Sequence, residues 1–170
     1  MNSDNDLKRS FAPVVDANTR VLVLGSLPGE RSLREGRYYA HPQNQFWTLI
    51  GSVIDRDLVP LDYAARLAAL RAAGVGLWDV VDSARRRGSS DAAIRDHRAN
   101  DLPALVARLP RLRAVAFNGG TAARIGTAAL AEGGSGSALS LIPLPSSSPL
   151  HTIGLAAKRP AWLALRTYLD

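Results

Sequence analysis

The sequence predicts an α/β fold, a three-layer α/β/α sandwich with a central four-stranded parallel sheet. Apolar runs of strand length alternate along the chain with segments whose apolar residues recur at helical spacing. This alternation is typical of parallel strands joined by right-handed crossovers, with helices covering both faces of the sheet. A length of 170 residues suits one domain built around a single core.

The four expected strands are the short apolar runs at residues 20–26, 75–79, 113–118 and 139–144. The expected helices show a wide apolar face or a helix start signal, and they cover residues 45–55, 61–73, 100–109, 120–131 and 155–169. Asn100-Asp101-Leu102-Pro103 gives the clearest start signal, because it combines a polar cap with an early proline.

Residues 20–170 are expected to form this single domain. Residues 1–19 are expected to form an N-terminal tail, and the polar character of residues 1–9 argues against a signal peptide. Residues 133–137, Gly-Gly-Ser-Gly-Ser, predict a flexible surface loop. No apolar run approaches the length of a membrane span, and the chain has no cysteine. We therefore expect a soluble, cytoplasmic protein without disulfides or thiolate metal sites.

The chain is basic, with 21 Lys and Arg against 15 Asp and Glu, and nearly all the cationic residues are arginine. Arginine is suited to bidentate contact with phosphate, so a polyanionic partner is one interpretation. An Arg- and Ala-rich composition that merely follows a GC-rich genome is the other. Arg85–Arg87 and Lys158–Arg159 are expected on solvated faces, where they could add non-specific phosphate binding.

Unusual residues follow each of the four expected strands. They are Gly25-Ser26-Leu27-Pro28-Gly29, Trp78-Asp79, Asn118-Gly119-Gly120 and Ser146-Ser147-Ser148. In an open parallel sheet the ligand site lies beyond the carboxyl ends of the strands, so these segments are expected to meet there. The G-x-G-x-x-G fingerprint and the Walker A lysine are both missing, which disfavours a dinucleotide or nucleoside triphosphate as the ligand.

The same segments carry a family resemblance. Residues 25–29, the run Tyr38-Tyr39-Ala40-His41-Pro42-Gln43-Asn44-Gln45-Phe46-Trp47 and the run Leu144-Pro145-Ser146-Ser147-Ser148-Pro149 resemble hypoxanthine-DNA glycosylases (DNA-deoxyinosine glycosylases) of the uracil-DNA glycosylase superfamily. The similarity continues through Leu77-Trp78-Asp79, Ser89-Ser90-Asp91, Ile94-Arg95-Asp96 and Phe117-Asn118-Gly119.

The resemblance implies a monofunctional DNA repair glycosylase with the uracil-DNA glycosylase fold. Such an enzyme flips a deaminated base out of double- or single-stranded DNA and hydrolyses its N-glycosidic bond. Hypoxanthine is the first expected base, with uracil or xanthine as further ones. No metal or cofactor is implied, and we expect a monomer.

Asn44 and Ser26 are the catalytic residues that the resemblance implies. Several superfamily members place Asp or Asn directly after the first strand, whereas this chain has Ser26, whose hydroxyl cannot act as a carboxylate base. Asn44 matches the Asn of the family's His-Pro-x-Asn segment and is expected to orient water through its carbonyl oxygen. The alternatives remain open: Ser26 could belong only to a tight turn, and Asn44 could cap the following helix.

Further residues are expected to bind the base or the DNA. The base-binding set is Gly25, Leu27, Pro28, Gly29, Tyr39, His41, Phe46 and Asn118, and the DNA-binding set is Ser146, Ser147, Ser148 and His151. Several have simpler alternatives, because Tyr39 and Phe46 could belong to the core and Asn118 could form a turn. Asp79 is expected to hold neighbouring loops rather than to act as an acid or base.

Three other functions stay open from the sequence alone. They are a uracil- or mismatch-specific glycosylase of the same superfamily, a DNA-binding module on this fold without turnover, and a protein that binds free nucleotides. The missing phosphate-loop lysine counts against the last of these.

Overall fold

The computed structural model describes residues 6–134 and 138–170. Its centre is a four-stranded parallel sheet with the strand order β3-β2-β6-β7. The strands are β2 (Val21–Gly25), β3 (Val75–Asp79), β6 (Ala114–Asn118) and β7 (Ser140–Leu144). All four strands were predicted from the sequence, with ends that agree within one residue.

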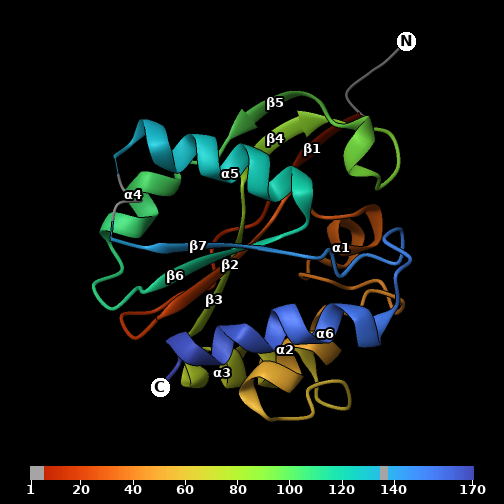
Figure 1. Ribbon diagram of the computed structural model, residues 1–170. Helices are drawn as coiled ribbons and strands as arrows, with labels where there is room; N and C mark the ends of the chain where they lie inside the picture. Colours follow the sequence, from red (N-terminus) through yellow and green to blue (C-terminus); the bar gives the residue numbers. More distant parts are fainter. Residues whose placement is uncertain (1–5, 135–137) are drawn as a thin grey trace.

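Helices cover both faces of this sheet (Figure 1). On one face lie α2 (Phe46–Ile54), α3 (Tyr63–Ala73) and α6 (Leu155–Leu163), and on the other lie α4 (Leu102–Ala107) and α5 (Gly120–Glu132). The predicted three-layer α/β/α sandwich is thereby confirmed. The last predicted helix is divided, because a 3-10 helix, Ala164–Tyr168, follows α6.

Strand β2 shows why the apolar runs are continuous. Val21 and Val23 pack in the core beneath α2, α3 and α6, while Leu22 and Leu24 pack in the core beneath α4 and α5. All four side chains are fully buried. A strand that buries both faces has no polar side to alternate with, so hydrophobicity is unbroken along it.

A second sheet was not predicted. It is antiparallel, has the order β1-β4-β5, and consists of β1 (Leu7–Arg9), β4 (Val81–Arg85) and β5 (Arg95–Ala99). Strand β5 reads Arg-Asp-His-Arg-Ala and is exposed throughout, so it lacks the apolar pattern on which a strand prediction depends. The short helix α1 (Glu30–Glu35) was missed as well, because six residues are too few to show a helical period.

The predicted N-terminal tail is wrong for residues 7–19. Strand β1 pairs with Ser83–Arg85 of β4, and Val14 forms a bridge with Leu77. The indole of Trp78 also donates to the carbonyl oxygen of Phe11 at 2.9 Å. Residues 1–5 of the predicted tail, and residues 135–137 of the predicted Gly/Ser loop, lie outside the described residues.

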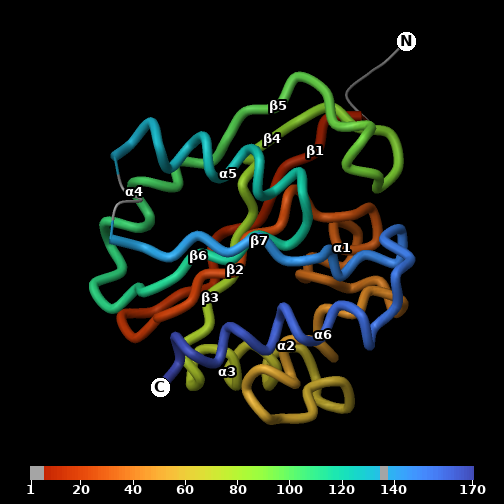
Figure 2. The backbone as a smooth tube through the Cα atoms, in the orientation of Figure 1, coloured from red at the N-terminus to blue at the C-terminus, as the bar shows by residue number. Residues whose placement is uncertain are grey.

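The loops that leave the parallel strands gather at one end of the sheet. Figure 2 shows the segment after β2 and the segment after β7 side by side next to α1. No helix in residues 6–134 or 138–170 is both long and apolar enough to span a membrane.

We predict that Gly126→Ala destabilises the fold. A Cβ at this position of α5 would overlap the buried Phe117 ring and come within 3.0 Å of Val80 Cγ1. Overpacking of this kind costs about 1–3 kcal/mol, measurable as a lower urea midpoint. Gly120→Ala in the same helix meets no atom within 4 Å and is the matched control. The control is expected to be neutral or to gain about 0.5 kcal/mol; equal midpoints for the two variants would contradict the close packing.

Candidate active site

A cavity of about 450 Å³ lies at the carboxyl ends of the parallel strands. The four segments that follow these strands all contribute to its wall, as the strand-exit argument predicted. Thirteen of the fourteen predicted site residues line it: Gly25, Ser26, Leu27, Pro28, Gly29, Tyr39, His41, Asn44, Asn118, Ser146, Ser147, Ser148 and His151. The described residues contain no group of three or more His, Asp or Glu side chains that could hold a metal ion.

Phe46 is the predicted base-binding residue that does not line the cavity. It is fully buried, and its ring stacks on the Tyr39 ring with centroids 3.9 Å apart. The helical position of Phe46 directs the side chain into the core, so Tyr39 stands between it and the cavity. Phe46 therefore supports the wall from behind instead of facing a ligand.

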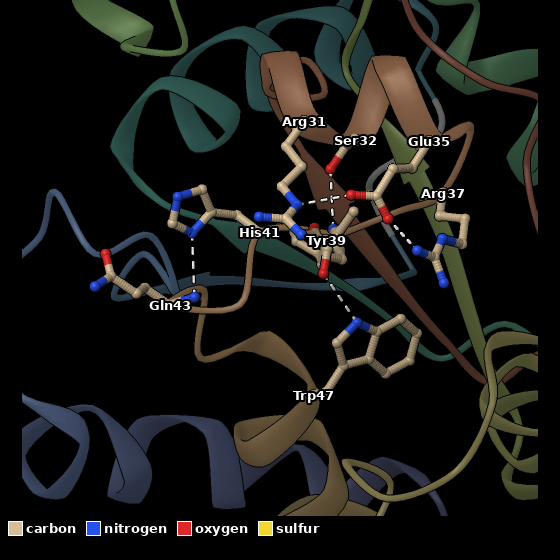
Figure 3. Close-up of polar contacts among 9 residues, drawn as sticks. Arg31, Ser32, Glu35, Arg37, Tyr39, His41, Gln43 and Trp47 are labelled. Atoms are coloured by element: carbon tan, nitrogen blue, oxygen red, sulfur yellow. Dashed lines mark hydrogen bonds and ion pairs between the residues drawn. The ribbon is translucent and has the colours of Figure 1, made fainter.

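The segment that carries Tyr39 is held in an unusual conformation (Figure 3). Tyr39 has a φ of 54°, a left-handed value that is uncommon for a residue with a side chain. The Trp47 indole donates to the Tyr39 carbonyl at 3.1 Å, and the Ala40 amide donates to Ser32 Oγ at 3.0 Å. These contacts, together with the Phe46 stack, compensate the backbone strain and fix the ring at the cavity.

Ser147 connects three segments of the wall. Its amide donates to Asn118 Oδ1 at 2.8 Å, and its carbonyl accepts from the Gln45 amide at 2.9 Å. Its hydroxyl donates to Asn44 Oδ1 at 2.7 Å and accepts from Asn118 Nδ2 at 2.9 Å. Ser147 is only 1% exposed, and this burial disfavours the predicted contact with DNA for this serine. Its hydrogen bonds join the loop after β7 to the end of β6 and the start of α2.

Asn118 has little capacity left for reading a base edge. Its amide nitrogen donates to Ser147 Oγ and, at 3.3 Å, to the Tyr39 hydroxyl, while its oxygen accepts from the Ser147 amide. Both N–H donors are thereby used within the protein. The geometry favours a structural role for Asn118 in place of the predicted base contact.

Asn44 uses its carbonyl oxygen inside the protein too. That oxygen accepts from the Phe46 amide at 3.0 Å and from Ser147 Oγ at 2.7 Å. Because a carbonyl oxygen has two lone pairs, the predicted orientation of water through this atom is disfavoured. The amide nitrogen of Asn44 has no hydrogen-bond partner among the described residues, and it remains available to a ligand. The bond to the Phe46 amide is a contact of the kind that the capping alternative expects, although Gln45 rather than Asn44 holds the N-cap position of α2.

Two cations expected on solvated faces are buried. Lys158 of α6 is 1% exposed and donates to Gln45 Oε1 at 2.8 Å and to the Ser148 carbonyl at 3.2 Å. Arg86 is 1% exposed and donates to the carbonyl oxygens of Pro28 at 2.5 Å and Gly88 at 2.8 Å. The predicted exposure is therefore wrong for these two residues, because each clamps a loop of the site through carbonyl groups.

Two aspartates in the cavity wall were absent from the predicted site. Asp79, at the end of β3, is 3% exposed, and its Oδ2 has no hydrogen-bond partner among the residues described. Asp91 begins a 3-10 helix, Asp91–Ala93, and accepts from Ser26 Oγ at 2.5 Å. Both belong to segments that carried the family resemblance, so the signal was present in the sequence. The sequence could not show that Asp91, 65 residues along the chain from Ser26, contacts the Ser26 hydroxyl.

The Asp79 carboxyl lies over the backbone of Gly25, close to the Tyr39 hydroxyl. A Cβ at residue 25 would lie 2.7 Å from Asp79 Oδ1 and 3.0 Å from Tyr39 Oη, so only glycine fits here. Burial and the neighbouring Asp91 carboxylate raise the pKa of Asp79 to about 7, although the Arg86 guanidinium counters them. Burial and Asp79 also raise the pKa of Tyr39, which keeps its hydroxyl protonated.

We predict that Asp79 makes folding stability depend on pH. A buried carboxyl with a raised pKa stabilises the folded protein below its unfolded pKa, and this contribution is lost as the pH rises to the folded value. With values of 3.8 unfolded and about 7 folded, wild type loses about 2–3 kcal/mol relative to Asp79→Asn between pH 5 and pH 8. Urea unfolding at both pH values measures this difference. Asp57→Asn, at an exposed aspartate, is the control; parallel pH profiles of wild type and Asp79→Asn would contradict the assignment.

Comparisons with known proteins agree with this arrangement. The family model described as the uracil DNA glycosylase superfamily matches residues 12–166. A protein of Methanosarcina barkeri (strain Fusaro / DSM 804), named hypoxanthine DNA glycosylase, is 46% identical over 112 residues, which are 66% of this chain and 71% of that protein. A second protein of that name, from Methanosarcina acetivorans, is 42% identical over 113 residues, which are 66% of this chain and 72% of that protein.

A solved structure is similar over nearly the whole chain. It is the solution NMR structure of a candidate uracil DNA glycosylase from Methanosarcina acetivorans, with a TM-score of 0.84 and 36% identity. The match covers 96% of this chain and 98% of that one. The resemblance carried by the strand-exit motifs is confirmed, and the chain belongs to the uracil DNA glycosylase superfamily.

Proposed function

We propose that this protein is a DNA glycosylase that removes hypoxanthine from DNA by hydrolysing the N-glycosidic bond of deoxyinosine. One observation carries the proposal: loops from four strand ends line one cavity, of a volume typical of small-ligand pockets, beside Asn44. The two relatives named hypoxanthine DNA glycosylase support hypoxanthine as the first substrate to test.

The chemistry explains why the enzyme needs such a cavity. The bond between base and sugar is inaccessible in a stacked duplex, so the nucleotide must be extruded before it reacts. Cleavage builds positive charge on the sugar and negative charge on the departing base. Fixed polar groups around the cavity can stabilise both charges without reorganising during the reaction.

Asn44 supplies one of these groups through its amide nitrogen. Its carbonyl oxygen is held by the Phe46 amide and the Ser147 hydroxyl, which sets the orientation of the whole side chain. The amide N–H groups can then donate to the base as it becomes negative, in the manner of an oxyanion hole. This role replaces the orientation of water through the carbonyl oxygen.

A single-turnover assay tests the proposed function. Duplexes that carry one inosine, uracil or xanthine are incubated with excess enzyme, and abasic products are cut by alkali and separated on a gel. We expect the inosine strand to be cleaved fastest. Faster cleavage of uracil would assign a uracil-directed glycosylase, and salt-sensitive binding without any product would assign a DNA-binding module.

We predict that Asn44→Ala and Asn44→Asp both slow cleavage of inosine DNA by about 100-fold or more. Aspartate keeps oxygen acceptors for the Phe46 amide and Ser147 Oγ but lacks the NH₂ group. Asn44→Asp therefore tests the amide donor separately from the contacts that the side-chain oxygen makes within the protein. Single-turnover rates are compared with the affinity for a duplex holding a tetrahydrofuran abasic analogue, which should change by less than about threefold. A wild-type rate for Asn44→Asp would refute the donor role.

A further inference from the structure

The hydroxyl of Ser26 is bonded to a carboxylate at the cavity wall. Ser26 Oγ donates to Asp91 Oδ1 at 2.5 Å, the short distance typical of a hydroxyl bonded to an ionised carboxylate. Ser26 follows β2 directly, and the two side chains come from loops on different sheets. The second oxygen of Asp91 has no hydrogen-bond partner among residues 6–134 and 138–170, and Asp91 lines the cavity.

Several contacts hold the loop that carries Asp91. Ser89 Oγ accepts from the Glu30 amide at 3.0 Å, which ties the loop to the start of α1. Ser90 Oγ accepts from the Ala92 amide at 3.3 Å and caps the 3-10 helix. Arg86 donates to the carbonyl of Pro28 and so fixes the same loop to the segment that follows Ser26. The carboxylate is therefore positioned before any substrate binds.

The surroundings of Asp91 favour its ionised form more than those of Asp79. Burial raises the pKa of Asp91, but the Ser26 hydrogen bond and the Arg86 charge both act against that rise. Asp79 has an unpartnered oxygen and faces the charge of Asp91. Of the two aspartates in the wall, Asp91 is thus the better candidate for a negative charge at neutral pH.

We propose that Asp91, oriented by the Ser26 hydroxyl, is the catalytic carboxylate that holds the attacking water against C1′ of the extruded nucleotide. Ser26 is then a positioning residue. The carboxylate that is missing directly after β2 is supplied by Asp91, from the loop between β4 and β5. This inference rests on the proposed function, because it assigns a residue to the same hydrolysis.

The step balances with water as the only co-reactant. The water oxygen forms a bond to C1′ while the bond from C1′ to the base nitrogen breaks. The electron pair of the broken bond leaves with the base. Asp91 takes a proton from the water and later returns it to solvent. The base anion takes a proton from solvent. The negative charge of a carboxylate at the cavity wall would also stabilise the positive sugar.

Two variants test this role on inosine DNA under single turnover. Asp91→Asn keeps the shape of the side chain but removes the base, and a loss of about 100-fold or more in rate is expected. Ser26→Ala is expected to lose about 10-fold and to move the acidic limb of the pH–rate profile to higher pH, because a carboxylate that loses a hydrogen bond becomes easier to protonate. Asp57→Asn is the control and should keep the wild-type rate.

Affinity for the tetrahydrofuran duplex separates chemistry from folding and binding. It should stay within about threefold of wild type in Asp91→Asn and Ser26→Ala, with unchanged urea midpoints. A wild-type rate in Asp91→Asn, or a parallel loss of rate and affinity, overturns the catalytic role. An unshifted pH profile in Ser26→Ala overturns the positioning role. If wild type cleaves none of the three substrates, the proposed function itself fails, and this assignment fails with it.

Discussion

The four hydrogen bonds of Ser147 are the interaction on which the cavity depends. They connect the loop after β7 with Asn118 at the end of β6 and with Asn44 before α2. Each bond contributes only about 1 kcal/mol net, but a buried partner left without one costs about 1–3 kcal/mol. The network is thus either complete or unfavourable, which gives the wall one defined shape.

The helix layer strengthens that network from outside. The Trp162 indole donates to the Pro145 carbonyl at 3.0 Å, and Lys158, about one turn earlier on α6, donates to the Ser148 carbonyl at 3.2 Å. Both side chains are buried, so these bonds are shielded from water. The first part of the loop after β7 is consequently held by an indole at Pro145, by amides at Ser147 and by a lysine at Ser148.

The sequence predicted the parallel sheet, because apolar runs of strand length alternate with segments of helical spacing. It also predicted that the loops meet, because parallel strands place their carboxyl ends at the same edge of the sheet. Val21–Gly25 is apolar without interruption, and the site position follows from where parallel strands end. Individual roles were less predictable. Ser147 and Ser148 are neighbours of identical type, yet only their backbone placement decides that one is buried. No pattern of spacing relates Asp91 to Ser26, since that contact depends on an unpredicted antiparallel sheet.

That antiparallel sheet links the beginning of the chain to the cavity. Strand β1 pairs with β4, and the Arg86 amide, directly after β4, donates to the Asp6 carbonyl at 2.8 Å. The Arg86 guanidinium in turn donates to the Pro28 carbonyl in the loop that follows Ser26. Residues 6–9 therefore brace the pocket from outside, and a shortened chain that begins after Arg9 would lose this brace while keeping every strand of the parallel sheet.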